Sequence, residues 1–597
     1  MKRILLLILF FTVSHVLIGQ NDTGIVSFNE AFKIITDRNE YIAGEKVWFK
    51  LSSIVNAHEA TSSKIAYIEI INPAGFSVSR KRVPLQIGNG FGELQLPDTL
   101  STGIYKIMGY TNWMKNFEIP MYPENLIYIY NPEKPYDRKF NSLNSGFNEI
   151  KFSSADGKTL WQREFFISAN DIELTIEGIE FNRIDKRRKV PISISSADIN
   201  NEFETANLSI VVRKIPDPYY CNYDSIINSL LYYEHKPDLD QINNLLSFKK
   251  FTNQSNIKYL PEFKGALLSG KILNKEGIPL PDNDVFLSFP DSIVKVTISR
   301  TNDLGDFYFF VKQNMSIKEI VINANNHNQD LIILINSNFL NEYPAISQPK
   351  ENNLNDEYKK YLDELYVNYR INQLYELNQS KSDSSYNFIK KSGFYQNAEH
   401  TFNLDNYVRL DSLHEYFYEI VPEVRIIKEK NERLLRVFNK KTNSLFEKNP
   451  ALFIDGVYLE YPEYIFNLKP KDCKKIDIIT SPVMLKNRVY DGLIAVFTYK
   501  SDLPITLQSN TSRIELNLFD KSDKFETSIN CNQNIPYFRN TIYWNPDFIL
   551  TKNASEKIEF YTGDDESWYE ILIRGFTNNG KSVYARKTFK VSTTKIN

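Results

Sequence analysis

Apolar and polar residues alternate in strand-length segments along most of this chain, and this alternation constrains the fold more than any other feature of the sequence. Between residues 46 and 53, for example, Val47, Phe49 and Leu51 alternate with neighbours that include Lys50. A period of two residues places one set of side chains on a buried face and the other in solvent. Aromatic residues make up 14% of the chain, and such rings pack well on a pleated surface. The sequence therefore predicts a mainly β fold.

Length and composition limit the number of domains and the classes of partner. A chain of 597 residues is too long for one hydrophobic core, so we expect roughly four domains. Cys221, Cys473 and Cys531 are too few and too scattered for a disulfide framework or a zinc knuckle, so packing must stabilise each domain. The 71 basic residues nearly balance the 73 acidic residues, which argues against a nucleic-acid partner and against a polybasic membrane patch.

The N-terminus predicts export. Lys2 and Arg3 precede an almost wholly apolar run from residue 4 to 18, and Gly19 supplies a cleavage position, as in a Sec signal peptide. The run is shorter than the roughly 20 residues that span a bilayer, which disfavours the alternative of an uncleaved anchor. The first cysteine is Cys221, so N-terminal lipid attachment is not expected. We expect no transmembrane segment after cleavage, and a location in the periplasm, at the outer membrane or on the cell surface.

The first predicted domain carries a family resemblance. TDRNEYIAGEKVWFK, from position 36, and LPDTLSTGIYKIMGYT, from position 96, resemble the macroglobulin-type sandwich of alpha-2-macroglobulins and of many bacterial envelope proteins. This resemblance implies a β-sandwich over residues 28–130. The protease trap of that family needs a thioester in a Gly-Cys-Gly-Glu-Gln sequence, and none of the three cysteines has these neighbours. A thioester mechanism is therefore excluded.

A further resemblance follows in the middle of the chain. ALLSGKILNKEGIPLPDNDVFLSF, from position 266, and SRTNDLGDFYFFV, from position 299, resemble the carboxypeptidase regulatory-like domain, a small transthyretin-like sandwich. Phe307 and Phe309 are expected to share one strand face. In that family the peptidase is a separate zinc domain, for which this chain has no suitable pair of histidines.

The candidate metal and catalytic motifs of this sequence are incomplete. No two histidines have the i, i+4 spacing of a helical zinc site, and HEYFY, at 414–418, has Tyr418 where the second histidine should be. Asp282 with Asp284, and the acidic triplet at 564–566, are calcium-ligand candidates without the spacing of a calcium loop, and solvated turns are the alternative. No GxSxG or phosphate-binding loop occurs. We expect no enzymatic activity, no cofactor and no metal.

Residues 451 to 500 carry the third resemblance. ALFIDGV, KKIDIITSP and DGLIAVFTYK resemble the plug domain of TonB-dependent outer-membrane receptors, which implies a small mixed α+β domain. Asp455, Gly456, Val457 and Gly492 form its signature, a tight hairpin turn that favours positive φ and a candidate interface. Roughly 100 residues follow Lys500, fewer than the about 22 strands of roughly 10 residues of a plugged barrel. We therefore expect a plug without its barrel.

The remaining segments complete the predicted order. The spacing of Tyr358, Leu362 and Leu365 predicts an amphipathic helix that either covers a sheet of this chain or binds a partner. Strand alternation also predicts a second sandwich and a C-terminal one. The whole order resembles barrel-less plug-domain proteins of Gram-negative envelopes. The expected boundaries are 1–19 for the signal peptide, 28–130 for the macroglobulin-like sandwich, 131–215 for the second sandwich, 216–261 for a partly helical connection, 262–345 for the transthyretin-like domain, 346–400 for a helical linker, 401–505 for the plug-like domain and 506–597 for the C-terminal sandwich.

Three classes of function follow from this order. The leading hypothesis is a non-catalytic exported scaffold or accessory subunit that binds an outer-membrane barrel or another envelope protein complex. The alternative is a peptide- or glycan-binding protein that delivers cargo to an outer-membrane transporter, with Trp48 and Trp113 either as stacking platforms or as packing residues. A hydrolase is the third class, and it lacks the residue constellations that hydrolysis requires.

Overall fold

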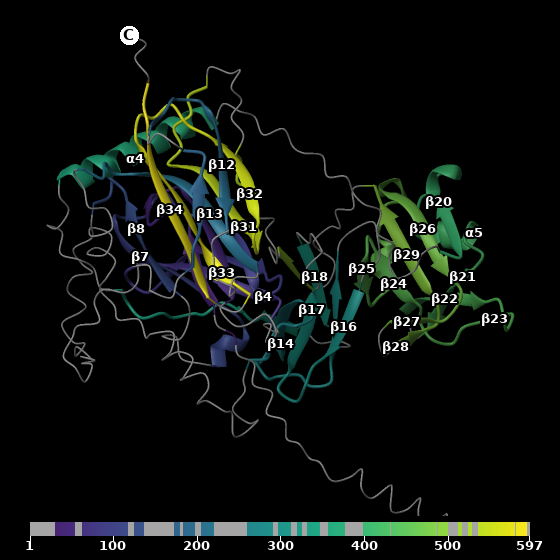
Figure 1. The fold of residues 1–597 in the computed structure, drawn as a ribbon. Helices are drawn as coiled ribbons and strands as arrows, with labels where there is room; N and C mark the ends of the chain where they lie inside the picture. The colour runs from purple at the N-terminus through teal and green to yellow at the C-terminus, as the bar shows by residue number, and fades with distance from the viewer. Residues whose placement is uncertain are drawn as a thin grey trace, which may run out of the picture.

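The computed structural model confirms the predicted mainly β fold, and its strands form three sandwiches and one mixed α+β domain within the described residues (Figure 1). The signal peptide predicted at 1–19 lies outside these residues, as does most of the connection predicted at 216–261. The structure describes residues 30, 32–53, 63–116, 124–135, 172–179, 183–196, 205–219, 259–289, 296–311, 319–324, 331–346, 356–376, 398–429, 432–485, 488–499, 511–515, 523–527, 535–578 and 581–593.

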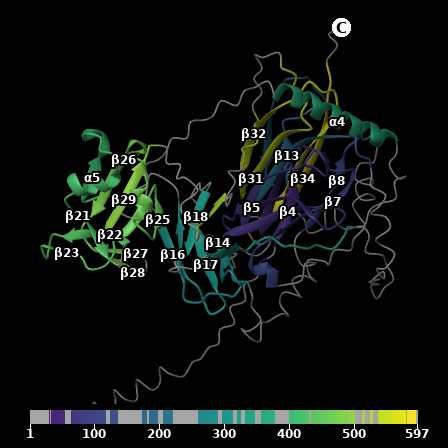
Figure 2. The ribbon, with the colours of Figure 1, turned by 180° about the vertical axis from the view of Figure 1, so that it is seen from behind.

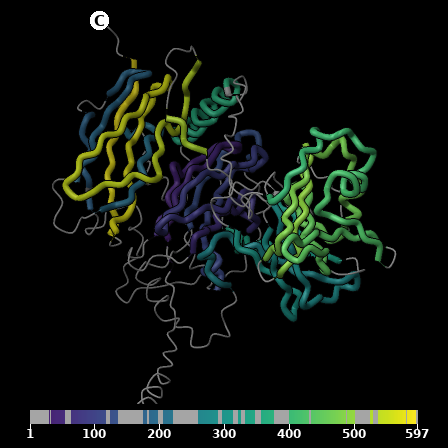
Figure 3. Tube along the Cα trace, turned by 90° about the vertical axis from the view of Figure 1, so that its right-hand side faces the viewer, coloured from purple at the N-terminus to yellow at the C-terminus, as the bar shows by residue number. Residues whose placement is uncertain are grey.

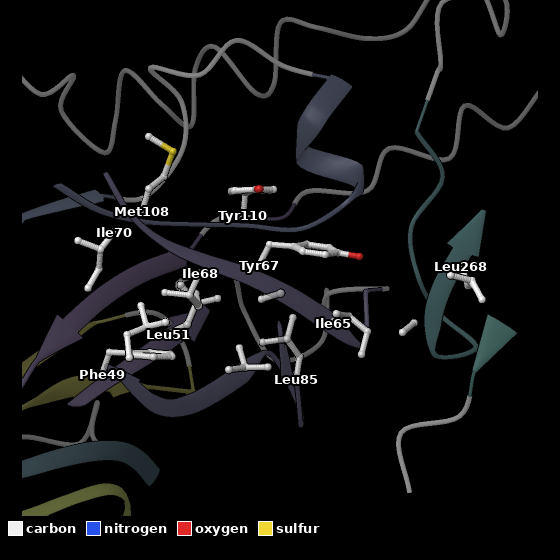
Figure 4. Packing of buried hydrophobic residues seen from close by; sticks show 14 of the residues in the cluster. Phe49, Leu51, Ile65, Tyr67, Ile68, Ile70, Leu85, Met108, Tyr110 and Leu268 are labelled. Atoms are coloured by element: carbon white, nitrogen blue, oxygen red, sulfur yellow. The ribbon is translucent and has the colours of Figure 1, made fainter. Parts of the chain in front are cut away.

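The first sandwich contains the macroglobulin-like motif. Val47, Phe49 and Leu51 are fully buried in its core, as the alternation predicts. Figure 4 shows this core around Phe49 and Ile68, and the same cluster extends through Ile65 and Tyr67 toward Leu268, which belongs to the sandwich that contains residues 266–335. One sheet has the order β1 (Phe32–Thr36), β3 (Lys46–Ser53), β6 (Asn89–Gln95), and the other has the order β2 (Glu40–Ile42), β8 (Glu124–Tyr130), β7 (Gly103–Tyr110), β4 (Ile65–Ile71), β5 (Ser77–Pro84).

The next sandwich along the sequence differs from the expectation, because two distant segments build it together. The second and C-terminal sandwiches, predicted separately at 131–215 and 506–597, are one body, which we call the split sandwich. Figure 3 shows strands of the two segments side by side. One sheet has the order β11 (Arg183–Ile184), β34 (Ser582–Val591), β33 (Trp568–Thr577), β13 (Thr205–Ile215), β31 (Thr541–Thr551), with β9 (Ile172–Glu173) also on β34, and the other has the order β10 (Thr175–Glu177), β12 (Lys189–Ser195), β32 (Ser555–Tyr561).

The burial of β13 explains why the two distant segments form one sandwich. All of its residues from Leu208 to Ile215 are buried, so the strand needs hydrogen-bonded neighbours on both edges. Those neighbours are β31 and β33, both antiparallel and both from the C-terminal segment. The alternation of a strand shows which side chains face inward, but it contains no information about which distant strand completes the ladder.

The third sandwich corresponds to the predicted transthyretin-like segment, with one added strand. Phe307 and Phe309 share its core, as predicted. The added strand β30 (Thr511–Glu515) was expected in the C-terminal sandwich, but it pairs with β18 here. One sheet has the order β17 (Asp306–Val311), β14 (Ala266–Asn274), β19 (Leu331–Ile335), and the other has the order β16 (Val296–Arg300), β15 (Asp284–Ser288), β18 (Glu319–Ala324), β30.

The mixed domain contains the small sheet expected between residues 451 and 500. The strands at 451–454 and 493–498 are parallel, whereas the strands at 457–459 and 473–479 pair antiparallel with the first and the second of them. It lies at the opposite end of the molecule from the long helix (Figures 1 and 2). The sheet has the order β20 (His400–Asn403), β26 (Cys473–Ile479), β29 (Leu493–Thr498), β24 (Ala451–Ile454), β25 (Val457–Leu459), accompanied by α5 (Leu413–Glu419), α6 (Glu463–Phe466), β21 (Val424–Glu429), β22 (Glu432–Asn439), β23 (Ser444–Leu445), β27 (Val483–Leu485) and β28 (Arg488–Tyr490).

The helix α4 (Asp356–Glu376) packs against two bodies, although its segment was expected to be a linker. Tyr358 and Leu362 lie in an apolar cluster with residues of β2, β7 and β8 of the first sandwich, so the helix covers a sheet of its own chain. The Tyr361 hydroxyl donates to the carbonyl of Lys214 in the split sandwich at 3.1 Å. The Lys214 ammonium is 3.0 Å from Glu364 of the helix. The helix therefore holds the first sandwich against the split sandwich.

We expect Leu362→Ala to lower the free energy of unfolding by about 2–5 kcal/mol, because it leaves a cavity under α4. Leu362 is fully buried, whereas Val367 on the same helix is 53% exposed, so Val367→Ala is the matched control. Urea unfolding followed by circular dichroism measures the difference. Equal stabilities of the two variants would contradict the covering role of the helix.

Candidate binding surface

The signature turn predicted at Asp455 and Gly456 has the expected backbone. Their φ angles are 46° and 82°, and the turn joins β24 to β25. The Asp455 carboxylate accepts hydrogen bonds from the Thr498 amide at 2.7 Å and from its hydroxyl at 2.6 Å. Because both oxygens of this buried carboxylate are held by the end of β29, the turn is part of the sheet's internal structure.

The strand that follows this turn contacts another part of the same chain. Val457 is buried, and the Tyr458 ring stacks on Phe286 of the third sandwich with centroids 3.8 Å apart. The Tyr458 amide donates to the Ser288 hydroxyl at 3.1 Å, and the Asn323 side-chain amide donates to the Tyr458 carbonyl at 3.0 Å. Tyr458, the residue directly after Val457, is therefore covered by the chain's own third sandwich.

Gly492 lies apart from the turn and has a packing role. Its φ is +98°, and a Cβ there would lie 2.8 Å from the Ile479 carbonyl oxygen. Only glycine allows this approach without strain. The structure thus places Asp455, Gly456 and Val457 together and Gly492 at the start of β29, and all four residues are buried.

Both faces of the mixed sheet are covered. Ile494 and Val496 of β29 pack toward α5 and α6, whereas Leu493, Ala495 and Phe497 join a cluster with Phe286 and Ile298 of the third sandwich. Arg488 of the mixed domain also pairs with Asp284 of the third sandwich. The mixed domain and the third sandwich therefore form one packed unit.

The calcium-ligand candidates have cationic partners. Asp282 pairs with Arg300 at 3.2 Å, and Asp284 pairs with Arg488. In the triplet at 564–566 each carboxylate faces a basic residue, namely Arg187 at 2.6 Å, Lys214 at 2.7 Å and Lys186 at 2.9 Å. Among the described residues no three His, Cys, Asp or Glu side chains gather as a metal site would require.

The two tryptophans considered as stacking platforms pack against protein. Trp113 is 2% exposed. Trp48 makes an edge-to-face contact with Phe525 at 5.2 Å and packs on the apolar cluster between the first and split sandwiches. Trp113 is therefore not accessible to a sugar ring, and Trp48 stabilises a junction.

The macroglobulin-like motif forms a buried polar junction between the first and split sandwiches. The Asp37 carboxylate accepts from the Tyr41 hydroxyl at 2.7 Å and from the Thr541 hydroxyl at 2.6 Å. The Arg38 guanidinium lies 3.0 Å from Glu45, and the Glu45 carboxylate also accepts from the Asn540 amide at 3.0 Å. Thr541 and Asn540 come from the C-terminal segment, so this motif connects the two ends of the chain.

Charges deeper in this junction compensate one another. Glu570 is 1% exposed and lies 2.6 Å from both Arg213 and Arg586. Burial alone would raise the pKa of this carboxyl, but the two guanidiniums outweigh burial and hold the pKa below its usual value. The Arg213 guanidinium also donates to the Asp37 carbonyl at 3.3 Å, which joins this pair to the motif.

A second buried carboxyl lies between the first and third sandwiches. Glu262 accepts the Tyr67 hydroxyl at 2.9 Å and the Leu267 amide at 2.6 Å. Burial raises the pKa of Glu262 to about 7, against the opposing effects of these hydrogen bonds and of Arg82 and Lys115. This carboxyl therefore titrates near neutral pH at the junction.

The outer face of the β17-β14-β19 sheet carries exposed apolar side chains on its two edge strands, and we call it the open face. Between them the central strand places Ser269 opposite Tyr308 and Lys271 opposite Leu334. Tyr308 and Phe310 on β17 are 50% and 41% exposed, and Ile332 and Leu334 on β19 are 40% and 46% exposed. Phe263, 51% exposed, has its ring 6.3 Å from that of Phe310. An antiparallel sheet with one solvated face normally carries polar residues there, so these exposed apolar residues make the open face a candidate binding surface.

Sequence reasoning missed this surface, although a signal was present. The run FYFFV at 307–311 is apolar in both phases of its alternation, a pattern typical of strands that are covered on both faces. Phe307 and Phe309 account for the inner face, and Tyr308 and Phe310 occupy the other.

No family model and no curated protein matches the sequence. Among solved structures, Escherichia coli alpha-2-macroglobulin activated by porcine elastase matches 95% of this chain and 44% of its own, with 9% identity and a TM-score of 0.23. A mutant Salmonella alpha-2-macroglobulin matches 96% and 40% with 8% identity and a TM-score of 0.22, and the Yersinia pseudotuberculosis adhesin InvE matches 52% and 59% with 8% identity and a TM-score of 0.13. The chain spans less than half the length of these macroglobulins, and likenesses at such TM-scores carry no functional argument.

In the described part of the chain no helix combines the length and the apolar character needed to cross a membrane.

We expect Glu570→Ala to lower the free energy of unfolding by about 3–5 kcal/mol, because it leaves Arg213 and Arg586 uncompensated in the junction. The matched control is Glu559→Ala, which breaks an ion pair with Lys189 whose side chains are about half exposed, and little change is expected there. Denaturant unfolding measures both variants. A Glu570→Ala protein as stable as the control would contradict the junction's role.

Glu262 predicts a pH dependence of stability. A carboxyl whose folded pKa is raised contributes stability that is complete below its unfolded pKa, near 4.5, and is lost as the pH rises through about 7. From this difference in pKa we expect Glu262→Gln to remove a fall of about 3 kcal/mol between pH 4.5 and 7.5. Thermal unfolding at several pH values measures this, with the exposed Glu556→Gln as control. Parallel pH profiles for Glu262→Gln and wild type would refute the prediction.

Proposed function

We propose that this protein is a non-catalytic exported scaffold that binds a partner protein of an outer-membrane machine through the open face. The observation that carries this proposal is the contrast between the two outer faces of the third sandwich. The face of the sheet that contains β15 is apolar at Phe286 and Ile298 and is covered by the mixed domain. The opposite face is apolar at Tyr308, Phe310 and Leu334 and is exposed.

The junctions support a scaffold role. Arg213 with the Asp37 carbonyl, and the Asp37 carboxylate with Thr541, join the first sandwich to the split sandwich through buried polar contacts. Tyr458 and Phe286 join the mixed domain to the third sandwich. Contacts of this kind cost free energy when they separate, because each leaves a buried polar or apolar group without its partner. A chain built this way presents the open face in a defined position.

The class of partner rests on the chemistry of the open face. Aromatic and aliphatic side chains such as Tyr308 and Leu334 fit the apolar core of a protein interface, where Tyr and Phe are enriched and charged residues are depleted. Lys271 and Asp306, 3.4 Å apart, supply a polar pair on the same face. The placement of the partner in the outer membrane rests on the predicted signal peptide and on the plug resemblance.

Site-specific photo-cross-linking in cells tests this function. A photoreactive phenylalanine analogue at Tyr308 or Leu334 is expected to yield one discrete adduct, and Phe310→Asp is expected to abolish it without changing the melting temperature. The matched control position is Ile549, which is 57% exposed on β31 of the split sandwich and should yield no such adduct. Adducts of equal yield from Ile549, or only free monomer from all positions, would count against the proposal.

A further inference from the structure

The strand β18 has the chemistry of an unprotected sheet edge. It pairs with β15 on one side, and its residues from Ile320 to Ala324 are all buried. Natural sheets protect their edges with lysine, proline, bulges or very short strands, because an open edge presents unpaired N–H and C=O groups to any extended chain. Within 320–324 the sequence is Ile-Val-Ile-Asn-Ala, which has none of the protective residues. This edge therefore requires a strand from elsewhere.

In the structure that strand is β30, which belongs to the segment beyond the mixed domain. The two strands are antiparallel in a register that runs from Glu319 with Glu515 to Asn323 with Thr511. Two of the five pairs in this register place a polar residue opposite an apolar one, Ser512 with Ile322 and Arg513 with Val321, whereas Ile514 lies opposite Ile320. Cross-strand pairs of β-branched or aromatic residues are more favourable by about 0.2–1 kcal/mol each. The register thus contains one β-branched pair, and a ligand residue of that kind opposite Ile322 would add a second.

We propose that the β18 edge is a strand-acceptor site for an extended peptide segment of a partner protein, and that β30 is its built-in, exchangeable occupant. The preferred ligand has β-branched or aromatic residues at alternate positions, so that these lie opposite Ile320 and Ile322. Main-chain hydrogen bonds give such strand addition its affinity, and alternate side chains give it specificity. This site is separate from the open face, so it stands or falls independently of the proposed function.

The acceptor strand also contacts the mixed domain. Asn323 donates to the Tyr458 carbonyl at 3.0 Å, and Val321 packs within the core cluster of the mixed domain. Residues directly opposite in an antiparallel pair share one face of the sheet. A ligand strand therefore has two inequivalent faces, one on the side of the third-sandwich core and one on the side of the mixed domain, which fixes its direction and register.

The test uses the full chain with Ile514→Pro, which puts into the middle of β30 a residue that lacks an N–H and fits a strand poorly, and so weakens the pairing and opens the edge. The probes are fluorescent synthetic peptides with the sequence of residues 509–517, the same peptide with Ser512→Val, and a control peptide with Ile514→Pro. We expect the opened chain to bind the natural peptide, and the Ser512→Val peptide about two- to five-fold more tightly, as one improved cross-strand pair predicts. Wild type should bind both at least about ten-fold more weakly, because the tethered β30 competes at a high effective concentration.

Hydrogen exchange assigns the site and tests the exchange. Bound peptide should slow the amides of 319–324 in the opened chain, and the Ser512→Val peptide in excess should speed the amides of 511–515 in wild type. If Ile514→Pro does not fold, Ser512→Gly with Ile514→Gly opens the same edge. The proposal is overturned if the opened chain binds no peptide, if the control peptide binds equally, if 319–324 stay unprotected, or if 511–515 in wild type never respond.

Discussion

The buried junction between the first and split sandwiches is the interaction on which the rest of the structure depends. Asp37 accepts a hydrogen bond from Thr541, and Glu45 accepts one from Asn540, so residues from the start of the chain bind residues near its end. The buried Glu570 carboxylate compensates the positive charges of Arg213 and Arg586 in this junction. Because β13 and β31 are neighbours in the split sandwich, the chain between them must start from this sandwich and return to it.

The pairing of these two segments explains where the third sandwich, the mixed domain and α4 lie in the sequence. The third sandwich and the mixed domain are inserted between the two halves of the split sandwich, and β30 lies on the returning segment. Segment 336–346, between β19 and α4, carries Phe339 and Tyr343 against the first sandwich, where Tyr343 donates to Glu69. The helix α4 then packs across the sandwich junction. What looked like a linker in the sequence is thus a packing element, because its apolar stripe had a sheet to cover.

Local chemistry allowed several features to be predicted from particular residues. Asp455 and Gly456 predicted a tight turn with positive φ, since few residues adopt that conformation without strain, and the structure has it. The alternation also predicted correctly which side chains of β3 face the core, and that Phe307 and Phe309 share a buried face. The function of the turn was not predictable, because nothing in ALFIDGV indicates that Tyr458 stacks on Phe286. FYFFV did not identify the open face, because a strand that is apolar in both phases is typical of one covered on both faces.

The sequence by itself determined the β character of the chain, the phase of its main strands, the α4 helix and the signature turn. These depend on periodicity and backbone preference, which act within a few residues. Only the tertiary structure decided that 172–215 and 541–591 share one sandwich, that β30 completes the third sandwich and that the macroglobulin-like motif forms a junction. Strand pairing uses main-chain hydrogen bonds that are the same for every residue, so the choice of partner emerges only when distant segments bury their apolar faces together.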